Sequence, residues 1–145
     1  MLFWLTFLAV FLADQASKMF IMGNMFLNQS IPVITNVFHI TYIRNPGAAF
    51  GLMAYRTSFF IAVSILVVLG IIVFYKKYGG KGTVQVTLGL IAGGALGNLV
   101  DRVRFGEVVD FLDFRVWPVF NLADSAIVVG AALLVLVFWR LEGKT

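Results

Sequence analysis

The amino-acid sequence predicts a membrane protein that is mainly α-helical, with four transmembrane helices and a small β-sheet on the outer membrane face. Of its 145 residues, 61% are hydrophobic and only 12% are charged, and mean hydropathy is +0.96. An average soluble domain carries roughly 25% charged residues, so this chain lacks the charge that a water-facing surface needs. The composition therefore excludes an ordinary soluble globule and a disordered chain.

Four apolar stretches predict the helices. They cover residues 2–21, 59–75, 84–103 and 120–139, and each is close to the length of about 20 residues that crosses a bilayer. Because backbone polar groups in lipid must be paired within the chain, such stretches are expected to be helical. The four spans leave no room for a second domain, so residues 1–145 are expected to form a single integral-membrane domain.

The first stretch also has features of a cleaved signal peptide. Its apolar core ends at Ala13-Asp14-Gln15-Ala16, a loose match to a cleavage site. However, no basic residue precedes the core, and Asp14 would lie at the cleavage site itself. We therefore favour a retained transmembrane span.

Basic residues predict the orientation of the chain. Lys76, Lys77 and Lys81 crowd the short second connection, and Arg140 and Lys144 follow the fourth span. Lysine and arginine favour the cytoplasmic side of a membrane, whereas the arginines of the longer connections are spread out and mixed with acids. We therefore expect both termini in the cytoplasm and the two longer connections outside.

The first outer connection, residues 24–56, shows no helical pattern. In its segment 33–42, β-branched and aromatic residues alternate, with Phe38 and Tyr42 on one face. This alternation is typical of a strand in a half-buried sheet. The single histidine, His39, lies on the other face, and we interpret it as a surface strand residue rather than a catalyst.

The composition also limits cofactors and partners. The chain has no cysteine and one histidine, so disulfides, thiolate catalysis and a metal site are not expected. The net charge of +4 is explained by cytoplasmic lysines, and no basic patch with interleaved aromatic residues indicates nucleic-acid binding. We therefore expect no metal, no other cofactor and no nucleic-acid partner.

Gly89, Gly93 and Gly97 recur at four-residue intervals in the third span. Small residues at this spacing allow helices to approach closely. We interpret them as a packing seam without a chemical role.

Ionisable residues within spans are functional candidates, because each costs about 2.5–3.5 kcal/mol to insert. Asp14 and Lys18 lie four residues apart on the first span, so they share a face and can neutralise each other. We favour a structural ion pair here over direct chemistry. Ser17 points away from Lys18, and Ser125 has no evident base, so a Ser–Lys dyad is weakly supported.

Asn98 and Arg102 also lie four residues apart, on the third span. The guanidinium keeps its charge, so it needs water, a carboxylate or a polar substrate beside it. The neighbouring Asp101 and Arg104 are interpreted as ordinary interfacial charges.

Two acids near the start of the fourth span are the main candidates for catalysis. Asp110 lies in the apolar segment 108–112, where a lone carboxylate is costly. Asp124 has a structural alternative, because Asn121 can cap a helix with Asp124 in its first turn, and these residues alone leave both readings open. The two carboxylates flank a short reversal, so they can converge and share one proton. Such a pair can activate water and protonate a leaving amine.

Asp113 competes with Asp110, since it lies only three residues further along. The apolar neighbours of Asp110 are expected to raise its pKa, whereas Arg115 is expected to keep Asp113 ionised. We therefore assign the pair to Asp110 and Asp124.

Five sequence blocks join these candidates: DQASK at 14–18, RNPGAAFG at 44–51, GALGNLVDR at 94–102, GEVVDF at 106–111 and FNLADS at 120–125. In this order on four spans they resemble lipoprotein signal peptidase (signal peptidase II), a family of bacterial membrane aspartic proteases. The resemblance covers nearly the whole chain.

The resemblance implies that Asp110 and Asp124 are catalytic and that the substrate is a prolipoprotein with a diacylglyceryl-modified cysteine. Cleavage before that cysteine releases the signal peptide. It also implies a monomer in the inner membrane, an active site near the outer face, and a small sheet and a surface helix that cradle the substrate. Inhibition by the peptide globomycin is expected. Positions matching the active site or substrate contacts are Asn45, Gly47, Asn98, Arg102, Asn121 and Ala123, and Asp14 and Lys18 match a supporting polar pair.

Two alternatives belong to other functional classes. In a proton-coupled transporter, Asp14 or Asp110 would carry the proton. In a non-catalytic assembly subunit, the glycine seam would hold a partner and the acids would cap helices. The transporter does not explain why two acids and two asparagines gather at one end of two spans, and neither protein would hydrolyse a peptide.

Overall fold

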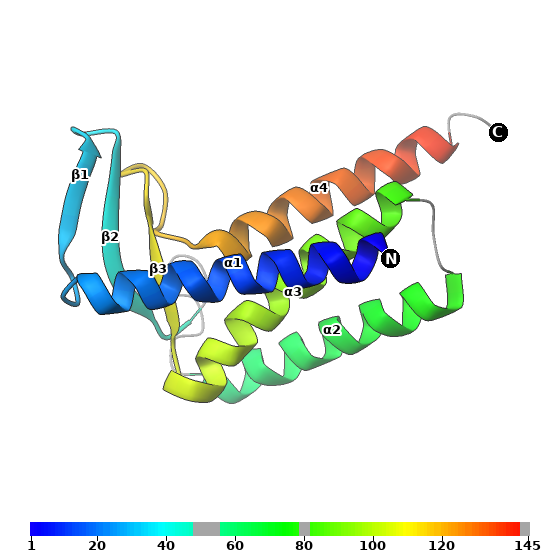
Figure 1. Ribbon diagram of the computed structural model, residues 1–145, viewed down its shortest axis with the longest axis horizontal. Coiled ribbons are helices and arrows are strands. Elements are labelled where there is room, and N and C mark those ends of the chain that lie inside the picture. Colours follow the sequence, from blue (N-terminus) through cyan, green and yellow to red (C-terminus); the bar gives the residue numbers. More distant parts are fainter. Residues whose placement is uncertain (48–55, 79–81, 143–145) are drawn as a thin grey trace.

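The computed structural model describes residues 1–47, 56–78 and 82–142, and within them it contains four helices and three strands. The helices are α1 (Leu2–Asn24), α2 (Thr57–Tyr78), α3 (Gly82–Phe105) and α4 (Leu122–Glu142). The strands are β1 (Ser30–Ile34), β2 (Phe38–Asn45) and β3 (Val108–Asp113). The helices run alongside one another, and the sheet lies across one end of the bundle, here called the sheet end (Figure 1).

All four predicted spans are confirmed as helices that are long and apolar enough to cross a membrane. The boundary that matters most for the site is the start of α4, predicted at residue 120 and found at Leu122. Phe120 instead forms a β-bridge with Leu112, and Asn121 precedes the first helical turn. The start of α1 and the end of α4 lie at the opposite end of the bundle from the sheet (Figure 1).

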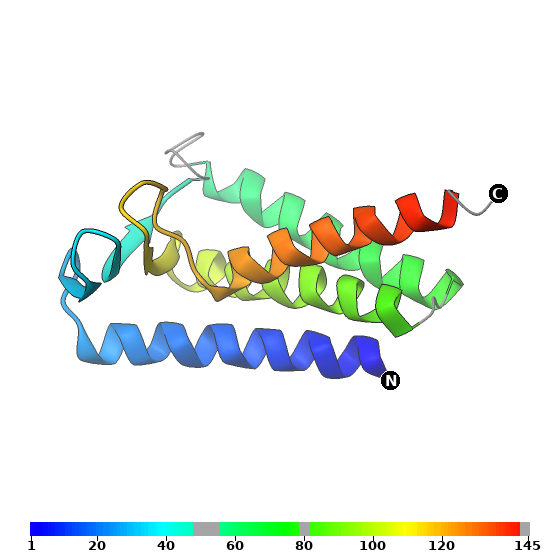
Figure 2. The same cartoon turned by 90° about the horizontal axis from the view of Figure 1, so that it is seen from above.

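Helix α3 lies in the middle of the bundle and packs against each of the other helices (Figure 2). Cβ atoms on Gly89 and Gly93 would lie 2.8 and 2.7 Å from the carbonyl oxygens of Phe3 and Phe7 in α1, and one on Gly94, which is outside the predicted seam, would collide with the carbonyl oxygen of Ala123 in α4. The predicted glycine seam is thereby confirmed as a packing surface. It brings the polar residues of α1, α3 and α4 within reach of one another.

The three strands form one antiparallel sheet in the order β1-β2-β3. The segment 33–42, predicted to belong to a small sheet, does so as parts of two strands, which are separated by a reversal at Asn36 with a left-handed φ of 62°. Asparagine tolerates this conformation, which makes the tight hairpin between β1 and β2 feasible. His39 lies in β2, as predicted.

Strand β3 is not predicted by the sequence pattern. Its residues Val108–Asp113 are buried on both faces, so hydrophobic and polar residues do not alternate along it. Pairing with β2 places Ile43 opposite Asp110 and Asn45 opposite Val108. Asp110, which the sequence places in the connection before the fourth span, therefore lies in a strand that holds it beside the end of β2.

The sheet is attached to α1 through an apolar cluster of Ile21, Tyr42, Val109 and Phe111. The surface helix that the family resemblance implies is not found among the described residues of the first outer connection. Residues 48–55, which include the end of the RNPGAAFG block, lie outside the described part of the chain, as do Lys81 and Lys144.

Candidate active site

One cavity at the sheet end gathers most of the polar residues singled out in the sequence. It has a volume of about 370 Å³ and lies between the sheet, the start of α2, the end of α3 and the start of α4. Its polar lining residues are Asn45, Gly47, Asn98, Arg102, Asp110 and Asp124. Apolar side chains, including Phe60, Val108 and Ile127, complete its wall. The two candidate aspartates therefore face the same space, although they belong to different elements.

Asp124 enters the cavity from the first turn of α4. Its backbone N–H donates to Oδ1 of Asn121 at 2.9 Å, and its Oδ2 accepts from the N–H of Asn121 at 3.3 Å. This reciprocal arrangement confirms the predicted helix cap. The second oxygen, Oδ1, accepts a hydrogen bond of 2.7 Å from Nδ2 of Asn98. The helix cap is therefore compatible with a role in the cavity, because the hydrogen bonds that cap α4 also orient the Asp124 carboxylate, which lines the cavity.

Asp110 is held by two neutral amides. Nδ2 of Asn45 donates to Oδ2 at 2.9 Å, and Nδ2 of Asn121 donates to Oδ1 at 2.7 Å. Burial, and next the negative charge of Asp124, raise the pKa of Asp110 to about 7, although these two hydrogen bonds act in the opposite direction. Asp110 can therefore keep a proton near neutral pH.

Asn121 joins the two aspartates directly. The side chain is fully buried. Besides capping α4, its amide donates to Asp110, to the carbonyl oxygen of Val109 at 3.2 Å and to Oδ1 of Asn98 at 3.1 Å. A buried amide with this many partners keeps one orientation, so the relative position of both carboxylates is set by one side chain.

Arg102 also lines the cavity. Its Nη2 donates to the carbonyl oxygen of Gly47 at 3.0 Å, and its guanidinium lies over the ring of Phe60 at 4.7 Å from the centroid. Oδ1 of Asn45 also accepts from the N–H of Gly47, at 3.0 Å. The side chains of Asn98 and Arg102 reach the same cavity, as their spacing predicts, and Arg102 ties α3 to the end of β2.

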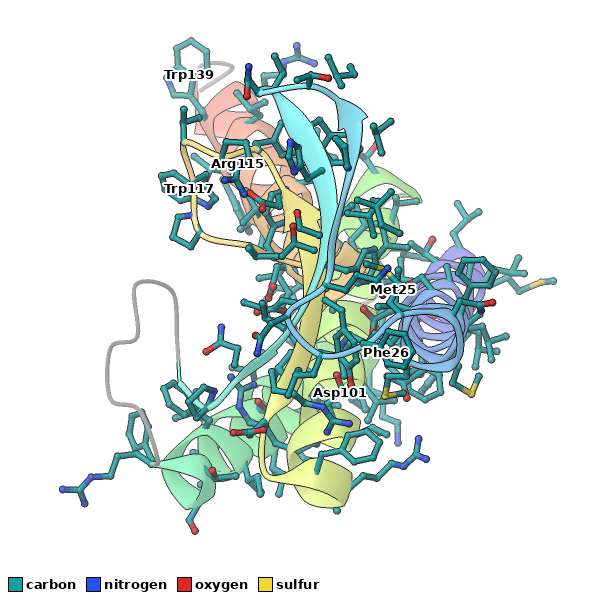
Figure 3. All side chains as sticks on the ribbon, turned by 90° about the vertical axis from the view of Figure 1, so that its left-hand side faces the viewer. Met25, Phe26, Asp101, Arg115, Trp117 and Trp139 are labelled. Atoms are coloured by element: carbon teal, nitrogen blue, oxygen red, sulfur yellow. The ribbon has the colours of Figure 1, made fainter. Side chains whose placement is uncertain are left out.

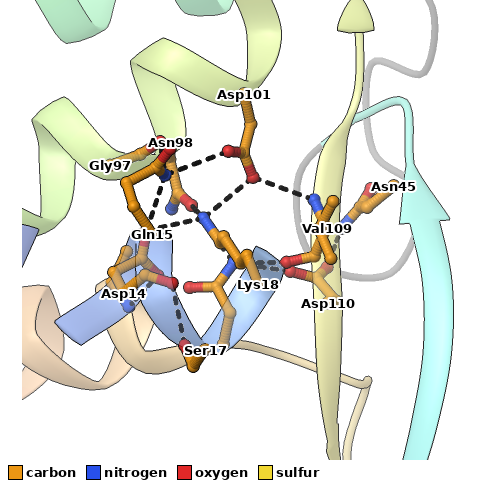
Figure 4. Close-up of polar contacts among 12 residues, drawn as sticks. Asp14, Gln15, Ser17, Lys18, Asn45, Gly97, Asn98, Asp101, Val109 and Asp110 are labelled. Carbon is orange, nitrogen blue, oxygen red and sulfur yellow. Dashed lines mark hydrogen bonds and ion pairs between the residues drawn. The ribbon is translucent and has the colours of Figure 1, made fainter. Parts of the chain in front are cut away.

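Asp14 and Lys18 form the predicted ion pair, with 2.9 Å between Nζ and Oδ2. Both side chains are essentially inaccessible to solvent. Asp14 also accepts a hydrogen bond of 3.0 Å from the N–H of Ala123, in the first turn of α4. Lys18 donates to Oδ1 of Asn98 at 2.9 Å (Figure 4). The pair thus supports the cavity from behind and does not line it.

Asp101 is the residue that the sequence interpretation placed wrongly. It is not an interfacial charge, because it is only 1% exposed and its Oδ2 contacts Nζ of Lys18 at 2.9 Å. Gln15 joins the same cluster by donating to Oδ1 of Asp101 at 3.1 Å. A sequence signal for Asp101 existed, since it lies three residues after Asn98 and so shares its helix face. Arg104, in contrast, is exposed, as predicted.

Asp113 lies outside this constellation. Its Oδ2 accepts from Oγ1 of Thr41 at 2.8 Å and pairs with Nη1 of Arg115 at 2.9 Å. Figure 3 shows Arg115 and Trp117 in the loop after β3, well separated from Asp101 along the sheet. Burial alone would raise the pKa of Asp113, but its hydrogen bonds and the charge of Arg115 together lower it. The pairing with Arg115 is as predicted.

The remaining candidates have structural partners. Ser17 donates to the carbonyl oxygen of Asp14 at 2.8 Å, and Ser125 donates to that of Asn121 at 3.0 Å. Neither hydroxyl contacts Lys18, so the geometry does not favour a Ser–Lys dyad. Within residues 1–47, 56–78 and 82–142, no group of three or more His, Cys, Asp or Glu side chains is arranged to hold a metal ion.

Comparison with known proteins identifies the relatives of this chain. The family model described as signal peptidase (SPase) II matches residues 6–140. The lipoprotein signal peptidase of Halothermothrix orenii is 52% identical over 139 residues, which cover 96% of each chain. That of Desulfitobacterium hafniense (strain DCB-2) is 52% identical over 150 aligned positions, which cover 100% of this chain and 99% of that protein.

A solved structure agrees with the sequence relatives. A bacterial membrane enzyme determined by the in meso method at 2.3 Å resolution superposes with a TM-score of 0.93 at 33% identity, covering 99% of this chain and 90% of the other. The four apolar helices and the three-stranded sheet are therefore the shared architecture. From its sequence, its fold and these relatives, this multi-pass membrane protein belongs to the signal peptidase II family of peptidases.

Proposed function

We propose that the protein is an aspartic endopeptidase that removes the signal peptide from diacylglyceryl-modified prolipoproteins, cutting before the lipidated cysteine. Membership of the signal peptidase II family supports prolipoproteins as the substrate class. The observation that carries the catalytic type is the pair of buried carboxylates, Asp110 and Asp124, facing one cavity and tied together by Asn121.

The two carboxylates divide the acid and base roles. Asp110, whose pKa is raised to about 7, holds the shared proton, while Asp124 is the ionised base. Asp124 takes a proton from water as the water oxygen attacks the carbonyl carbon before the modified cysteine. Asp110 donates its proton to the carbonyl oxygen. When the C–N bond breaks, the proton on Asp124 passes to the leaving amine and the proton on the oxygen returns to Asp110, which restores the pair.

The surrounding amides and Arg102 keep this arrangement in place. Asn45 and Asn121 hold Asp110, and Asn98 holds Asp124. Arg102 and Gly47 also line the cavity, where a guanidinium and a backbone segment can hold the peptide carbonyls of the substrate. Ala123 is fully buried, and its small side chain lets α4 lie close to α3.

The membrane position follows from the distribution of charge. Lys76 and Lys77 end α2, and Arg140 lies in the last turn of α4, at the end of the bundle away from the sheet. The positive-inside rule then directs this end and both termini to the cytoplasm, and the cavity to the outer face of the inner membrane. A lipid-bearing substrate reaches such a cavity by diffusion within the membrane. The protein acts as a monomer and binds globomycin at this cavity.

The decisive test is a cleavage assay with purified protein in detergent. A prolipoprotein that carries the diacylglyceryl group and the same protein without it are incubated separately, and the products are identified by mass spectrometry. We expect cleavage of the lipidated substrate alone, with the modified cysteine as the new N-terminal residue. Absence of cleavage by folded protein would leave the transporter and the assembly subunit, since neither hydrolyses a peptide.

A further inference from the structure

Behind the cavity lies a buried cluster of charges in which one lysine meets two carboxylates. Nζ of Lys18 contacts Oδ2 of Asp14 and Oδ2 of Asp101, both at 2.9 Å, and it also donates to Oδ1 of Asn98 at 2.9 Å (Figure 4). All three charged groups are at most 1% exposed. Burying such a cluster has a large desolvation cost, so stability alone does not explain it.

Asp101 connects this cluster to the strand that carries Asp110. The same Oδ2 atom that contacts Lys18 accepts a hydrogen bond of 3.1 Å from the backbone N–H of Val109. Val109 directly precedes Asp110, and its carbonyl oxygen is held by Asn121. One carboxylate oxygen of α3 therefore fixes the backbone immediately before a proposed catalytic residue.

Lys18 connects the cluster to Asp124. An asparagine amide can be oriented in two ways, but Oδ1 of Asn98 receives hydrogen bonds from Lys18 and from Asn121. An ammonium group only donates, so Lys18 forces the oxygen of Asn98 toward itself. Nδ2 of Asn98 is then the atom that faces Asp124, at 2.7 Å.

We propose that Asp101 is a positioning residue for the cleavage reaction: it anchors the strand before Asp110 and, by holding Lys18 in place, fixes the orientation of the Asn98 amide toward Asp124. This inference rests on the function proposed above. The Asp101 side chain does not line the cavity, and it acts on both aspartates through Val109, Lys18 and Asn98.

The test separates the hydrogen bonds of Asp101 from its charge. Asp101→Asn keeps an oxygen that can accept from Val109, whereas Asp101→Ala does not. In the cleavage assay we expect kcat to fall by about tenfold in Asp101→Asn and by about a hundredfold in Asp101→Ala, because small misplacements of reacting groups have effects of this size. KM should remain near the wild-type value, since the substrate contacts are intact.

The pH profile of kcat is a second measurement, because a merely structural role of Asp101 would leave that profile unchanged. The charged groups facing Asp101 and the cavity are Asp14 and Lys18 of α1, Arg102 of α3, Asp110 of β3 and Asp124 of α4. Removing the negative charge in Asp101→Asn favours ionised carboxylates, so the profile should move to lower pH. Lys18→Met removes a positive charge, so its profile should move to higher pH.

Asp113→Asn is the matched control. Asp113 is also a buried carboxylate that accepts a backbone N–H and pairs with a cation, but it lies outside the cluster. Its kcat and pH profile should match the wild type. If the Asp101 variants do not yield folded protein, Gln15→Ala removes the hydrogen bond to Oδ1 of Asp101 without a change of charge. Its kcat should then fall with an unmoved pH profile.

The outcomes distinguish this inference from the proposed function. Wild-type protein that does not cleave the lipidated prolipoprotein refutes the proposed function. Active wild-type protein together with an Asp101→Asn variant of normal kcat and normal pH profile refutes the positioning role alone. If the Asp101 variants do not fold, an unchanged kcat of Gln15→Ala refutes the positioning role instead.

Discussion

Asp110 and Asp113 lie three residues apart on the same strand, and both are almost inaccessible to solvent. Successive side chains of a strand point to opposite faces, so the two carboxylates meet different surroundings. Burial and the negative charge of Asp124 raise the pKa of Asp110 to about 7, although the two amides that donate to it act in the opposite direction. Asp113 receives a hydroxyl and a guanidinium, and its pKa falls. Burial raises the pKa of both carboxylates; hydrogen bonds and the charge of Arg115 outweigh it at Asp113, whereas at Asp110 burial and the charge of Asp124 prevail.

The largest effect should come from removing either proposed catalytic carboxylate. Asp110→Asn and Asp124→Asn should each lower kcat by about 10²–10⁴-fold, the usual contribution of a general acid or base. Folding and at least some globomycin binding should survive, since an amide fills the same space. Cleavage assays and inhibitor binding on the same detergent preparation measure both properties. An active Asp110→Asn together with an inactive Asp113→Asn would show that the other carboxylate of the strand is the catalyst.

A second prediction compares Arg102, which lines the cavity together with Asp110, with Arg115, which pairs with Asp113. Arg102→Lys should lower kcat/KM by about tenfold, because lysine lacks the planar fork that contacts the carbonyl oxygen of Gly47 while stacking on Phe60. Arg115→Lys keeps the charge beside Asp113 and should cleave at the wild-type rate. Equal rates for Arg102→Lys and the wild type would mean that Arg102 only anchors the chain at the membrane boundary.

A third prediction concerns stability as a function of pH. The pKa of Asp110 is raised from 3.8 to about 7 on folding, so the folded protein binds more protons than the unfolded chain between these values. Stability from this group is present below pH 3.8 and is lost as pH rises to about 7. Asp110→Asn should therefore unfold at a higher temperature than the wild type at pH 7, and this difference should shrink at pH 4.

Asp113 should show the opposite dependence, because its folded pKa is lowered. Its contribution to stability is present above its unfolded pKa and is lost as pH falls through the folded one. Thermal unfolding of both variants in detergent from about pH 2 to pH 8 measures the two slopes, that of Asp113 below its unfolded pKa and that of Asp110 above it. Slopes of the same sign would contradict the assigned protonation states.

The smallest expected effect is that of Asp113→Asn on activity. This substitution weakens a hydrogen-bonded pair at the surface of the sheet and should cost about 1 kcal/mol of stability, with cleavage near the wild-type rate. Unfolding midpoints and initial rates measured on one preparation separate the two effects. A rate loss without a loss of stability would extend the catalytic region to the far face of the sheet.

The features that the sequence predicts correctly depend on neighbours along the chain. The Asp14–Lys18 pair and the shared direction of Asn98 and Arg102 follow from the four-residue spacing of a helix. The cap formed by Asn121 and Asp124 follows from three-residue spacing at a helix start. These interactions are decided within one or two helical turns, so the local sequence contains all that they require.

Other parts of the site were decided by tertiary structure, because their partners are distant in sequence. Asn45 reaches Asp110 across 65 residues, and Gln15 reaches Asp101 across 86. The spacing of Asp101 from Asn98 places both on one helix face, but the carboxylate becomes buried only because the glycines of α3 let α1 pack against that face. Likewise, hydrophobic and polar residues do not alternate along β3. This segment becomes a strand only because β2 supplies the hydrogen bonds that the buried backbone of β3 needs.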